Sequence, residues 1–317
     1  MRYSYSQIAM FERCGEQYRR RYIEREKFPP ALAMIRGRGQ SEAQHTDLQT
    51  KIDTDELADE PDLVDVARDK VHKDAGSPDD VDLTPEERSE GFELARGKVV
   101  DQAVRATRLH HQNVAPTLAP ADVEGKLEFD IPLNEEGETR KMIGYYDVLE
   151  EDVTLRDTKT SLKKPLANIA DESSQLALYS YAIRKTTGVT PPRSSLDYLV
   201  LSKAKDPSKA PTPKKPTTAD AAMKAASKAL VKDLEGPELL MGAIGRDRAI
   251  RYSTEHTTDD QARVIARAQE SIAAIESGFF PPAAPGGWWC SKKMCGYHDT
   301  CPYVRGGAVV TIPGVNE

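Results

Sequence analysis

The sequence contains no apolar run long enough to span a membrane. Its first residues also lack the basic start, apolar core and small-residue cleavage site of a secretory signal peptide. We therefore expect a cytoplasmic protein that does not enter a membrane. Cysteine is scarce, with four residues in a chain of 317. Because the cytosol keeps thiols reduced, a framework of stable disulfides is not expected. Four thiolates are, however, the set that a tetrahedral zinc ion or an iron–sulfur cluster takes.

An excess of positive charge is also missing, because 44 Lys and Arg face 51 Asp and Glu, for a net charge of -7. Taken alone, this balance argues against nucleic-acid binding, since neutralising phosphates requires Lys and Arg. A net charge says little about one local groove, however. The acidic residues concentrate over 47–82, and basic clusters lie at 19–27, 36–38, 163–164 and 203–215. Each basic cluster could equally be the solvated face of a helix.

Capping residues and apolar spacing predict helices through the first third of the chain. Ser4 and Thr84 each stand where a side chain can cap the helix that follows. The acidic, mixed stretch over 53–82 predicts short helices joined by loops. The expected helices span 5–24, 31–52 (whole or as a broken pair) and 84–112.

Alternation of apolar and polar residues then predicts strands. The expected elements are a three-stranded meander over 123–132, 140–149 and 153–158, a helix over 173–187 and a strand over 195–202. This order predicts an α/β core with a mixed sheet flanked by helices. The remaining expected elements are a Pro- and Lys-rich loop over 206–218 and helices over 219–243 and 258–277.

Two acids and a lysine fall on adjacent predicted strands. Asp157 and Lys159 are two residues apart on one strand, so their side chains point to the same face. Asp147 belongs to the preceding strand, across a short turn, and can reach the same place. Two such carboxylates suit Mg²⁺ or Mn²⁺, and a lysine beside them can stabilise charge on a phosphate, as phosphodiester hydrolysis requires. Alternatively, the acids flank turns and Lys159 is solvated, because Asp-x-Lys alone is a common tripeptide.

A longer pattern surrounds these residues: Gly-x-x-Asp, a turn, Asp-x-Lys-Thr, and then a helix with Gln-x-x-x-Tyr. Its members are Gly144, Asp147, Asp157, Lys159, Thr160, Gln175 and Tyr179, preceded by an early helix with Ser4, Ser6, Ile8 and Cys14. The pattern resembles the RecB-like branch of the PD-(D/E)XK nuclease superfamily. The resemblance implies a restriction-endonuclease-like core, in which helices flank a mixed sheet, with helical insertions.

The resemblance also implies roles for individual residues. The implied ligands of Mg²⁺ or Mn²⁺ are Asp147, Asp157 and the backbone carbonyl of Thr158, and the implied catalytic lysine is Lys159. Gln175 and Tyr179 lie one helical turn apart and would position DNA or brace the site.

A histidine from an early helix usually completes the metal site in such relatives. His45 is the candidate, although Ser41 occupies the position of the expected glycine. Outside the family context, His45 would be a partly exposed helix histidine. Glu124 resembles an acid on the first strand of the family, and either assists the site or faces solvent.

Cys290, Cys295 and Cys301 form a tight C-terminal trio, and Cys14 lies far from them in sequence. From their chemistry alone, four thiols suit zinc or an iron–sulfur cluster, or are unrelated buried residues. A subset of the RecB-like branch carries one cysteine before the core and three after it, which bind a [4Fe–4S] cluster that joins the two ends of the domain. The resemblance therefore favours iron–sulfur over zinc, although the first gap of the trio is longer than usual.

The sequence thus predicts one nuclease domain over 1–302 and a tail over 303–317. The expected parts of the domain are a helical insertion at about 47–112, a catalytic core at about 121–203, and C-terminal helices with the cysteine segment over 219–302. The expected reaction is Mg²⁺- or Mn²⁺-dependent hydrolysis of DNA. By resemblance, it would be an exonuclease on single-stranded ends, in phage or cellular recombination, repair or CRISPR adaptation.

No Gly-x₄-Gly-Lys-Ser/Thr pattern occurs, so unwinding would come from a helicase or from a recombination or CRISPR partner. One alternative is a non-catalytic DNA-binding module that keeps the fold and a structural iron–sulfur or zinc centre. A second alternative is a cytosolic zinc protein with an unrelated enzymatic activity.

Overall fold

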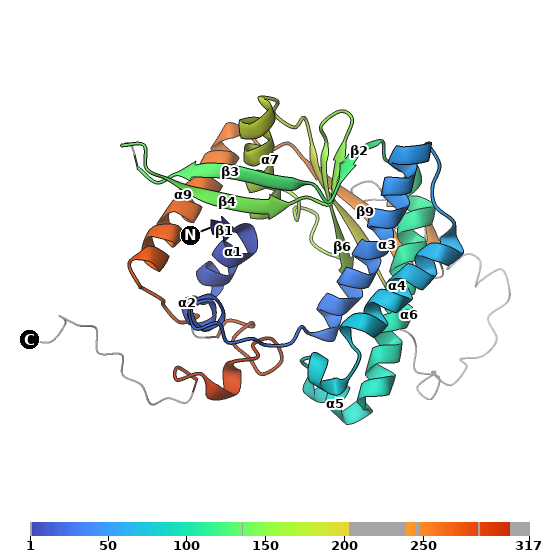
Figure 1. Ribbon diagram of the computed structural model, residues 1–317, viewed down its shortest axis with the longest axis horizontal. Helices are drawn as coiled ribbons and strands as arrows, with labels where there is room; N and C mark the ends of the chain where they lie inside the picture. Colours follow the sequence, from blue (N-terminus) through green and yellow to red (C-terminus); the bar gives the residue numbers. More distant parts are fainter. Residues whose placement is uncertain (1, 135, 203–238, 245–246, 285, 305–317) are drawn as a thin grey trace, which may run out of the picture.

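The computed structural model describes residues 2–134, 136–202, 239–244, 247–284 and 286–304. Two β-sheets lie at its centre, with helices on both sides (Figure 1). The helices are α1 (Tyr5–Arg13), α2 (Gly15–Tyr18), α3 (Leu32–Thr54), α4 (Glu60–Asp74), α5 (Pro85–Glu90), α6 (Phe92–Asn113), α7 (Ser174–Thr187) and α9 (Thr258–Glu276). Shorter turns are η1 (Arg19–Ile23), η2 (Pro78–Asp80), η3 (Ala115–Thr117) and η5 (His298–Thr300). Among the described residues, no helix is long and apolar enough to cross a membrane.

The strands are β1 (Arg2–Ser4), β2 (Pro120–Val123), β3 (Lys126–Pro132), β4 (Thr139–Tyr145), β5 (Val148–Glu150), β6 (Leu155–Ser161), β7 (Ser194–Val200), β8 (Leu239–Ile244) and β9 (Asp247–Thr254). The smaller sheet has the order β1-β4-β3 and the larger sheet β2-β5-β6-β7-β9-β8. Strands β6 and β7 run parallel and are connected through α7, whereas β5 and β9 pair antiparallel with their neighbours. The predicted fold class, a mixed sheet flanked by helices, is confirmed.

The predicted meander is wrong in one respect that matters for the site. Strands β3 and β4 form a hairpin in the smaller sheet, whereas β5 and β6 pair in the larger one. The predicted strand over 140–149 is therefore two strands in two sheets, and the chain passes between them at Tyr146 and Asp147. The Tyr146 hydroxyl donates to Asp122 at 2.5 Å, and its ring fills the space beside Gly125, where a Cβ would collide with it. These contacts hold the crossing point in place.

Helices α3, α4 and α6 pack against one another as an arm on one side of the sheets (Figure 1). Helix α3 runs unbroken through Gly37 and Gly39. A Cβ at Gly39 would lie 2.8 Å from Val71 and 2.9 Å from the carbonyl of Ala67, so this glycine permits the close approach of α4. The stretch over 53–82, predicted as short helices, contains the 15-residue helix α4.

Two predicted helices are interrupted. The helix expected over 84–112 breaks at Gly91, whose φ of 92° suits a residue without a side chain. Thr84 caps its first part, α5, as predicted. The helix expected over 5–24 breaks at Cys14 into α1, α2 and η1, although Ser4 accepts the N–H of Gln7 at 3.3 Å as a cap.

The C-terminal half confirms the helices over 173–187 and 258–277 as α7 and α9. Helix α7 ends at Gly188 in the left-handed conformation. Within the helix expected over 219–243, residues 219–238 lie outside the described residues, and residues 239–243 belong to β8. Strand β9, which pairs with β7 and β8, was not predicted. The loop expected over 206–218 also lies outside the described residues.

Candidate active site

Strand β6 carries the predicted aspartate and lysine. Asp157 is 3% exposed, and the Lys159 ammonium Nζ lies 2.6 Å from its Oδ2. The alternation of side chains along β6 places both residues on one face, as predicted. Parallel pairing with β7 sets Asp157 opposite Leu196 and Lys159 opposite Tyr198, whereas pairing with β5 ends at Arg156.

Gln175, in the first turn of α7, bridges the two. Its amide Nε2 donates to Asp157 Oδ1 at 3.3 Å, and its Oε1 accepts from Lys159 Nζ at 3.4 Å. Ser173 caps the helix by accepting the N–H of Leu176, which fixes the start of α7. One amide thereby orients both the carboxylate and the ammonium.

Asp147 reaches the same strand from the crossing point between the sheets. Its Oδ2 accepts the backbone N–H of Thr158, the residue between Asp157 and Lys159, at 2.7 Å. Burial, reinforced by the negative charge of Asp157, raises the pKa of Asp147 to about 7. Burial likewise raises the pKa of Asp157. Burial opposes the charged form of Lys159, but the two carboxylates outweigh it and raise its pKa.

The two carboxylates fit a hard divalent cation. Beyond the ion pair with Lys159, the buried Oδ2 of Asp157 has no hydrogen-bond partner among the described residues. The Lys159 ammonium compensates the charge of this oxygen, which leaves the remaining lone pairs of the two carboxylates for a cation. Mg²⁺ commonly takes one or two carboxylates and keeps water or phosphate oxygens as its other ligands. Asp147, Asp157 and the Thr158 carbonyl are a donor set of this kind.

His45 lies on α3, with its Nδ1 3.8 Å from Glu124 Oε2. This nitrogen is buried and lacks a hydrogen-bond partner among the described residues. Glu124, which follows β2, also accepts from Ser41 at 3.4 Å, and its backbone N–H donates to the carbonyl of Asp147. In the described part of the chain, however, no three His, Cys, Asp or Glu side chains are arranged to hold one metal ion. His45 therefore lies near the site without completing a preformed ligand set.

Gly144 and Tyr179 meet beside these residues. A Cβ on Gly144 would lie 2.7 Å from Cε1 of Tyr179, so the ring occupies space that only a glycine leaves open. Burial raises the pKa of Tyr179. The glycine and tyrosine of the sequence pattern thus form one packing contact between β4 and α7.

A cleft of about 1750 Å³ extends from Gln175, Tyr179 and Gly144. Residues of α1 and α3 line it, and it reaches the C-terminal segment at Lys293 and Met294. Arg36 and Tyr145 line the cleft, and the sequence analysis did not single them out as site residues. Arg36 belongs to the basic cluster at 36–38, but a charge cluster alone does not distinguish a buried side chain from a solvated one.

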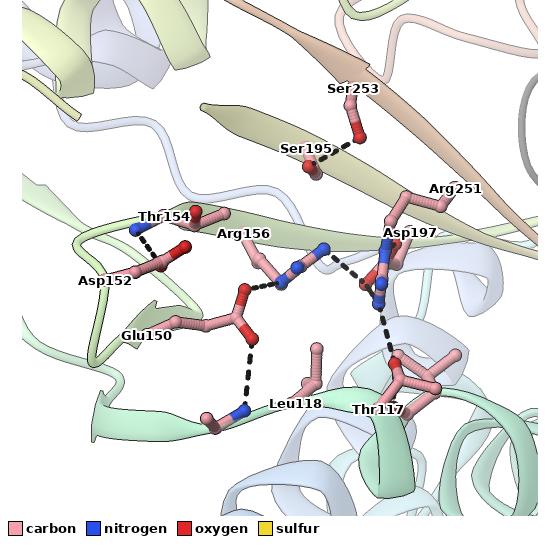
Figure 2. A network of polar contacts seen from close by, with 12 residues as sticks. Thr117, Leu118, Glu150, Asp152, Thr154, Arg156, Ser195, Asp197, Arg251 and Ser253 are labelled. Carbon is pink, nitrogen blue, oxygen red and sulfur yellow. Dashed lines mark hydrogen bonds and ion pairs between the residues drawn. The ribbon is translucent and has the colours of Figure 1, made fainter. Parts of the chain in front are cut away.

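A buried network of ion pairs supports the catalytic strand (Figure 2). Asp197 on β7 accepts from Arg251 on β9 at 2.7 and 3.0 Å, and lies 3.9 Å from Arg156 on β6. Arg156 also pairs with Glu150 on β5. The Arg251 guanidinium reaches Thr117 at 3.2 Å. These contacts tie four adjacent strands together, and Arg156 immediately precedes Asp157.

The four cysteines converge. Cys14, Cys290, Cys295 and Cys301 all line one small cavity between the α1–α2 break and the C-terminal segment. Burial raises the pKa of Cys295, and the neighbouring thiols reinforce the rise. The chain ends are also joined by backbone, because the N–H of Gly15 donates to the carbonyl of Pro281 at 2.7 Å.

Comparison with known proteins identifies the family. No curated protein matches the chain. Among solved structures, the chain is similar to a protein named SSO0001, with 18% identity, a TM-score of 0.35, and coverage of 69% of this chain and 79% of that one. It is also similar to a "Putative exonuclease" from Eubacterium rectale, with 10% identity, a TM-score of 0.45, and coverage of 97% and 88%. The family assignment rests on sequence, because the model of the PD-(D/E)XK nuclease superfamily matches residues 2–302. This chain therefore belongs to the PD-(D/E)XK nuclease superfamily.

Proposed function

We propose that this nuclease is a Mg²⁺- or Mn²⁺-dependent exonuclease of the RecB-like branch that degrades single-stranded DNA from its ends. The observation that carries the proposal is the contact of Lys159 with the buried carboxylate of Asp157, with Asp147 held beside them by the backbone of Thr158. Gln175, which bonds both Asp157 and Lys159, also lines a large cleft, whereas the two acids and the lysine lie behind it and are not part of the lining.

In the proposed reaction, Asp147, Asp157 and the Thr158 carbonyl hold the cation, with His45 as a further ligand. A bound cation would polarise the phosphate and activate water. Lys159 places its positive charge where negative charge develops on the phosphate. Gln175 keeps the ammonium and the Asp157 carboxylate in fixed orientations. Tyr179 braces the site through its contact with Gly144 and borders the path of DNA.

The lining of the cleft favours a single strand over a duplex. Tyr145, Met34 and Leu94 line it and are 59%, 54% and 56% exposed. Unpaired bases stack on an aromatic ring such as that of Tyr145 and make apolar contacts with Met34 and Leu94, whereas a duplex hides the faces of its bases and presents phosphates. Part of the wall is acidic, with Glu87, Glu90 and other carboxylates of α5 and α6, and repels the phosphates of either form, so the preference rests on the exposed apolar side chains.

We further propose that the four cysteines bind a structural [4Fe–4S] cluster. Their convergence on one cavity supports a shared centre. Among the described residues, the cysteines form no group arranged to hold a single ion, and the choice of an iron–sulfur cluster over zinc rests on the family resemblance. A cluster there would join Cys14 to a segment nearly the whole chain away and would stabilise the fold by closing that loop.

The domain organisation, location and partners follow from this proposal. One nuclease domain over 1–302 would act in the cytoplasm. A separate helicase, or a recombination or CRISPR partner, would supply the single-stranded ends. These statements remain predictions from the sequence and the family resemblance.

The test is digestion of end-labelled single-stranded DNA by anaerobically purified full-length protein with Mg²⁺ or Mn²⁺. We expect cleavage of linear strands and not of circular strands, and the 5′- or 3′-label released first gives the polarity. Asp157→Ala and Lys159→Ala should abolish cleavage while leaving the protein folded. Lys126→Ala is a matched control, because Lys126 is an exposed strand lysine paired with Glu128 in the other sheet.

Cleavage of circular strands would replace the exonuclease proposal with an endonuclease. A wild-type protein that binds DNA but cuts nothing would point to the non-catalytic binding module. If Asp157→Ala and Lys159→Ala cut DNA as fast as the wild type, the active site lies elsewhere.

A further inference from the structure

Arg36 is a buried arginine in the wall of the cleft. It lies on α3, is 8% exposed, and lines the same cleft as Gln175 and Tyr179. Its guanidinium contacts Thr160, the residue after Lys159, through Nε to Oγ1 at 3.3 Å and through Nη2 to the carbonyl at 3.4 Å. Nη1 donates to Gln102 at 3.0 Å. Arg36 is therefore fixed against the catalytic strand, one residue beyond Lys159.

No carboxylate pairs with Arg36 among the described residues, because Thr160 and Gln102, its hydrogen-bond partners, are neutral. Burial lowers its pKa, but an arginine stays charged in proteins. A buried charge without a counter-ion is costly. Two other cations of the cleft are neutralised, Arg105 by Asp247 and Asp101, and Lys98 by Glu90. Arg13 and Arg21 also line the cleft, and their contacts among the described residues are the amide of Gln17 and the ring of Tyr22. Arg36 differs from Arg105 and Lys98 in keeping its charge uncompensated, and from Arg13 and Arg21 in being buried.

The hydrogen bonds of Arg36 leave part of the guanidinium available. Of its five N–H groups, three are used by Thr160 and Gln102, so one N–H remains on each terminal nitrogen. Two N–H groups of one guanidinium match two oxygens of a phosphate. The side chain is held in place by neutral acceptors, and so it needs little reordering to bind an anion.

We propose that Arg36 binds a phosphodiester of the substrate strand next to the bond that is cut, and thereby positions that bond over Lys159. This inference rests on the proposed function, and it adds a residue to the substrate-binding side of the site. The ligand of Arg36 is the pair of non-bridging oxygens on a phosphate next to the reacting one. Arg36 is bonded to Thr160 and not to Asp157 or Lys159, so its guanidinium lies beside the reacting phosphate and not at it. Arg36 is thus a positioning residue.

The test measures binding and cleavage separately. A fluorescein-labelled oligothymidylate is titrated with the full-length protein at several salt concentrations, with Ca²⁺ in place of Mg²⁺ to prevent cleavage. Arg36→Gln should weaken binding roughly tenfold, and should reduce the slope of log K against log salt by about 0.7, the value for one phosphate contact on a single strand. Arg36→Lys keeps the charge and should retain the slope. Arg38→Gln is the matched control on the same helix, because Arg38 is exposed and paired with Asp74.

Single methylphosphonate linkages locate the contact, because each removes the charge of one phosphate. We expect one linkage to weaken binding to the wild type and to Arg36→Lys, and to have no added effect with Arg36→Gln. Cleavage by Arg36→Gln should lose more in KM than in kcat.

The inference would be overturned if Arg36→Gln showed the same salt slope as the wild type. It would also be overturned if every methylphosphonate linkage weakened binding to Arg36→Gln as much as to the wild type. In either case Arg36 would only connect α3 with β6. If Arg36→Gln does not fold, the methylphosphonate scan of the wild type and Arg36→Lys decides, and the absence of any sensitive linkage overturns the inference. If the wild type cuts DNA and Arg36→Gln binds and cuts it equally well, this inference alone is refuted. A wild type that neither binds nor cuts DNA refutes the proposed function as well.

Discussion

Asp147 accepts the backbone N–H of Thr158 at 2.7 Å, and so the crossing point between the two sheets is bonded to the strand that carries Asp157 and Lys159. Antiparallel pairing sets Val148 opposite Arg156 and so brings Asp147 level with Asp157, and the bond to Thr158 fixes the second carboxylate there. The site therefore depends on how the smaller sheet meets the larger one. Residues that hold this junction should affect catalysis even though they do not touch the substrate.

Replacing Gly144 tests one such junction contact. Gly144→Ala places a methyl group 2.7 Å from the Tyr179 ring, and should lower the free energy of unfolding by about 1–3 kcal/mol through overpacking. Gly144→Ala combined with Tyr179→Leu should recover part of this loss, because the smaller side chain makes room. Gly97→Ala is the control, since nothing lies within 4 Å of its added Cβ. Urea denaturation measures these variants and Tyr179→Leu alone. If the loss in the double variant equals the sum of the losses in the two single variants, Gly144 and Tyr179 do not form the contact described.

Gln175 is expected to act on turnover. Gln175→Leu removes both the donor to Asp157 and the acceptor for Lys159 while keeping a side chain of similar size. We expect kcat to fall about 10- to 100-fold, the usual effect of losing a residue that orients a site. Far-ultraviolet circular dichroism should show an unchanged fold. A kcat equal to that of the wild type would mean that the amide does not orient the catalytic pair.

Asp197 is expected to be important for stability. Asp197→Ala leaves the buried guanidinium groups of Arg156 and Arg251 without their shared carboxylate (Figure 2). Removing one partner of a buried ion pair typically costs about 3–5 kcal/mol. Glu128→Ala breaks ion pairs on the surface and should leave the thermal midpoint almost unchanged. Similar midpoints for the two variants would show that the network is not a main support of the sheet.

Because of His110, we expect the free energy of unfolding to fall under mildly acidic conditions. Burial lowers the pKa of His110 from 6.5 to about 4, so the folded protein binds its proton only below about pH 4, whereas the unfolded chain binds it below 6.5. The unfolded state holds more protons between these values, and stability is therefore lost as pH falls through this window, by about 3 kcal/mol in total. His110→Leu should show a smaller fall than the wild type, and His72→Leu, an exposed control, the same fall. Urea midpoints at a series of pH values measure the difference, and parallel curves for wild type and His110→Leu would refute it.

If the four cysteines bind an iron–sulfur cluster, the protein should be coloured. Anaerobically purified protein should be brown, with iron and acid-labile sulfide in equal amounts, if four thiolates hold a cluster. Cys295→Ser should lose the iron and lower the thermal midpoint by loosening the tie between the chain ends. A colourless protein that contains zinc would replace the cluster with the zinc alternative. A protein without metal would leave four thiols that are merely packed together.

Local chemistry was enough to predict several features from the sequence. The spacing of Asp157 and Lys159 places both on one face of a strand, and this follows from the two-residue repeat alone. The caps at Ser4 and Thr84 were equally local, because a cap depends on side chains within one turn of the helix. The helix over 173–187 also ended at Gly188, where a left-handed residue was needed.

Only the tertiary structure decided what depends on contacts distant in sequence. The apolar residues at 239–243 suited a helix or a strand, and pairing with β9 made them a strand. The same pattern over 140–149 could not show that the chain changes sheets at Asp147, since that choice depends on the packing of Tyr146 against Gly125. Likewise, the sequence identifies Arg36 as a charge, but only the packing of α3 on β6 makes it a buried one. Periodicity reports which face a side chain occupies, whereas burial and pairing depend on the segments that come to cover that face.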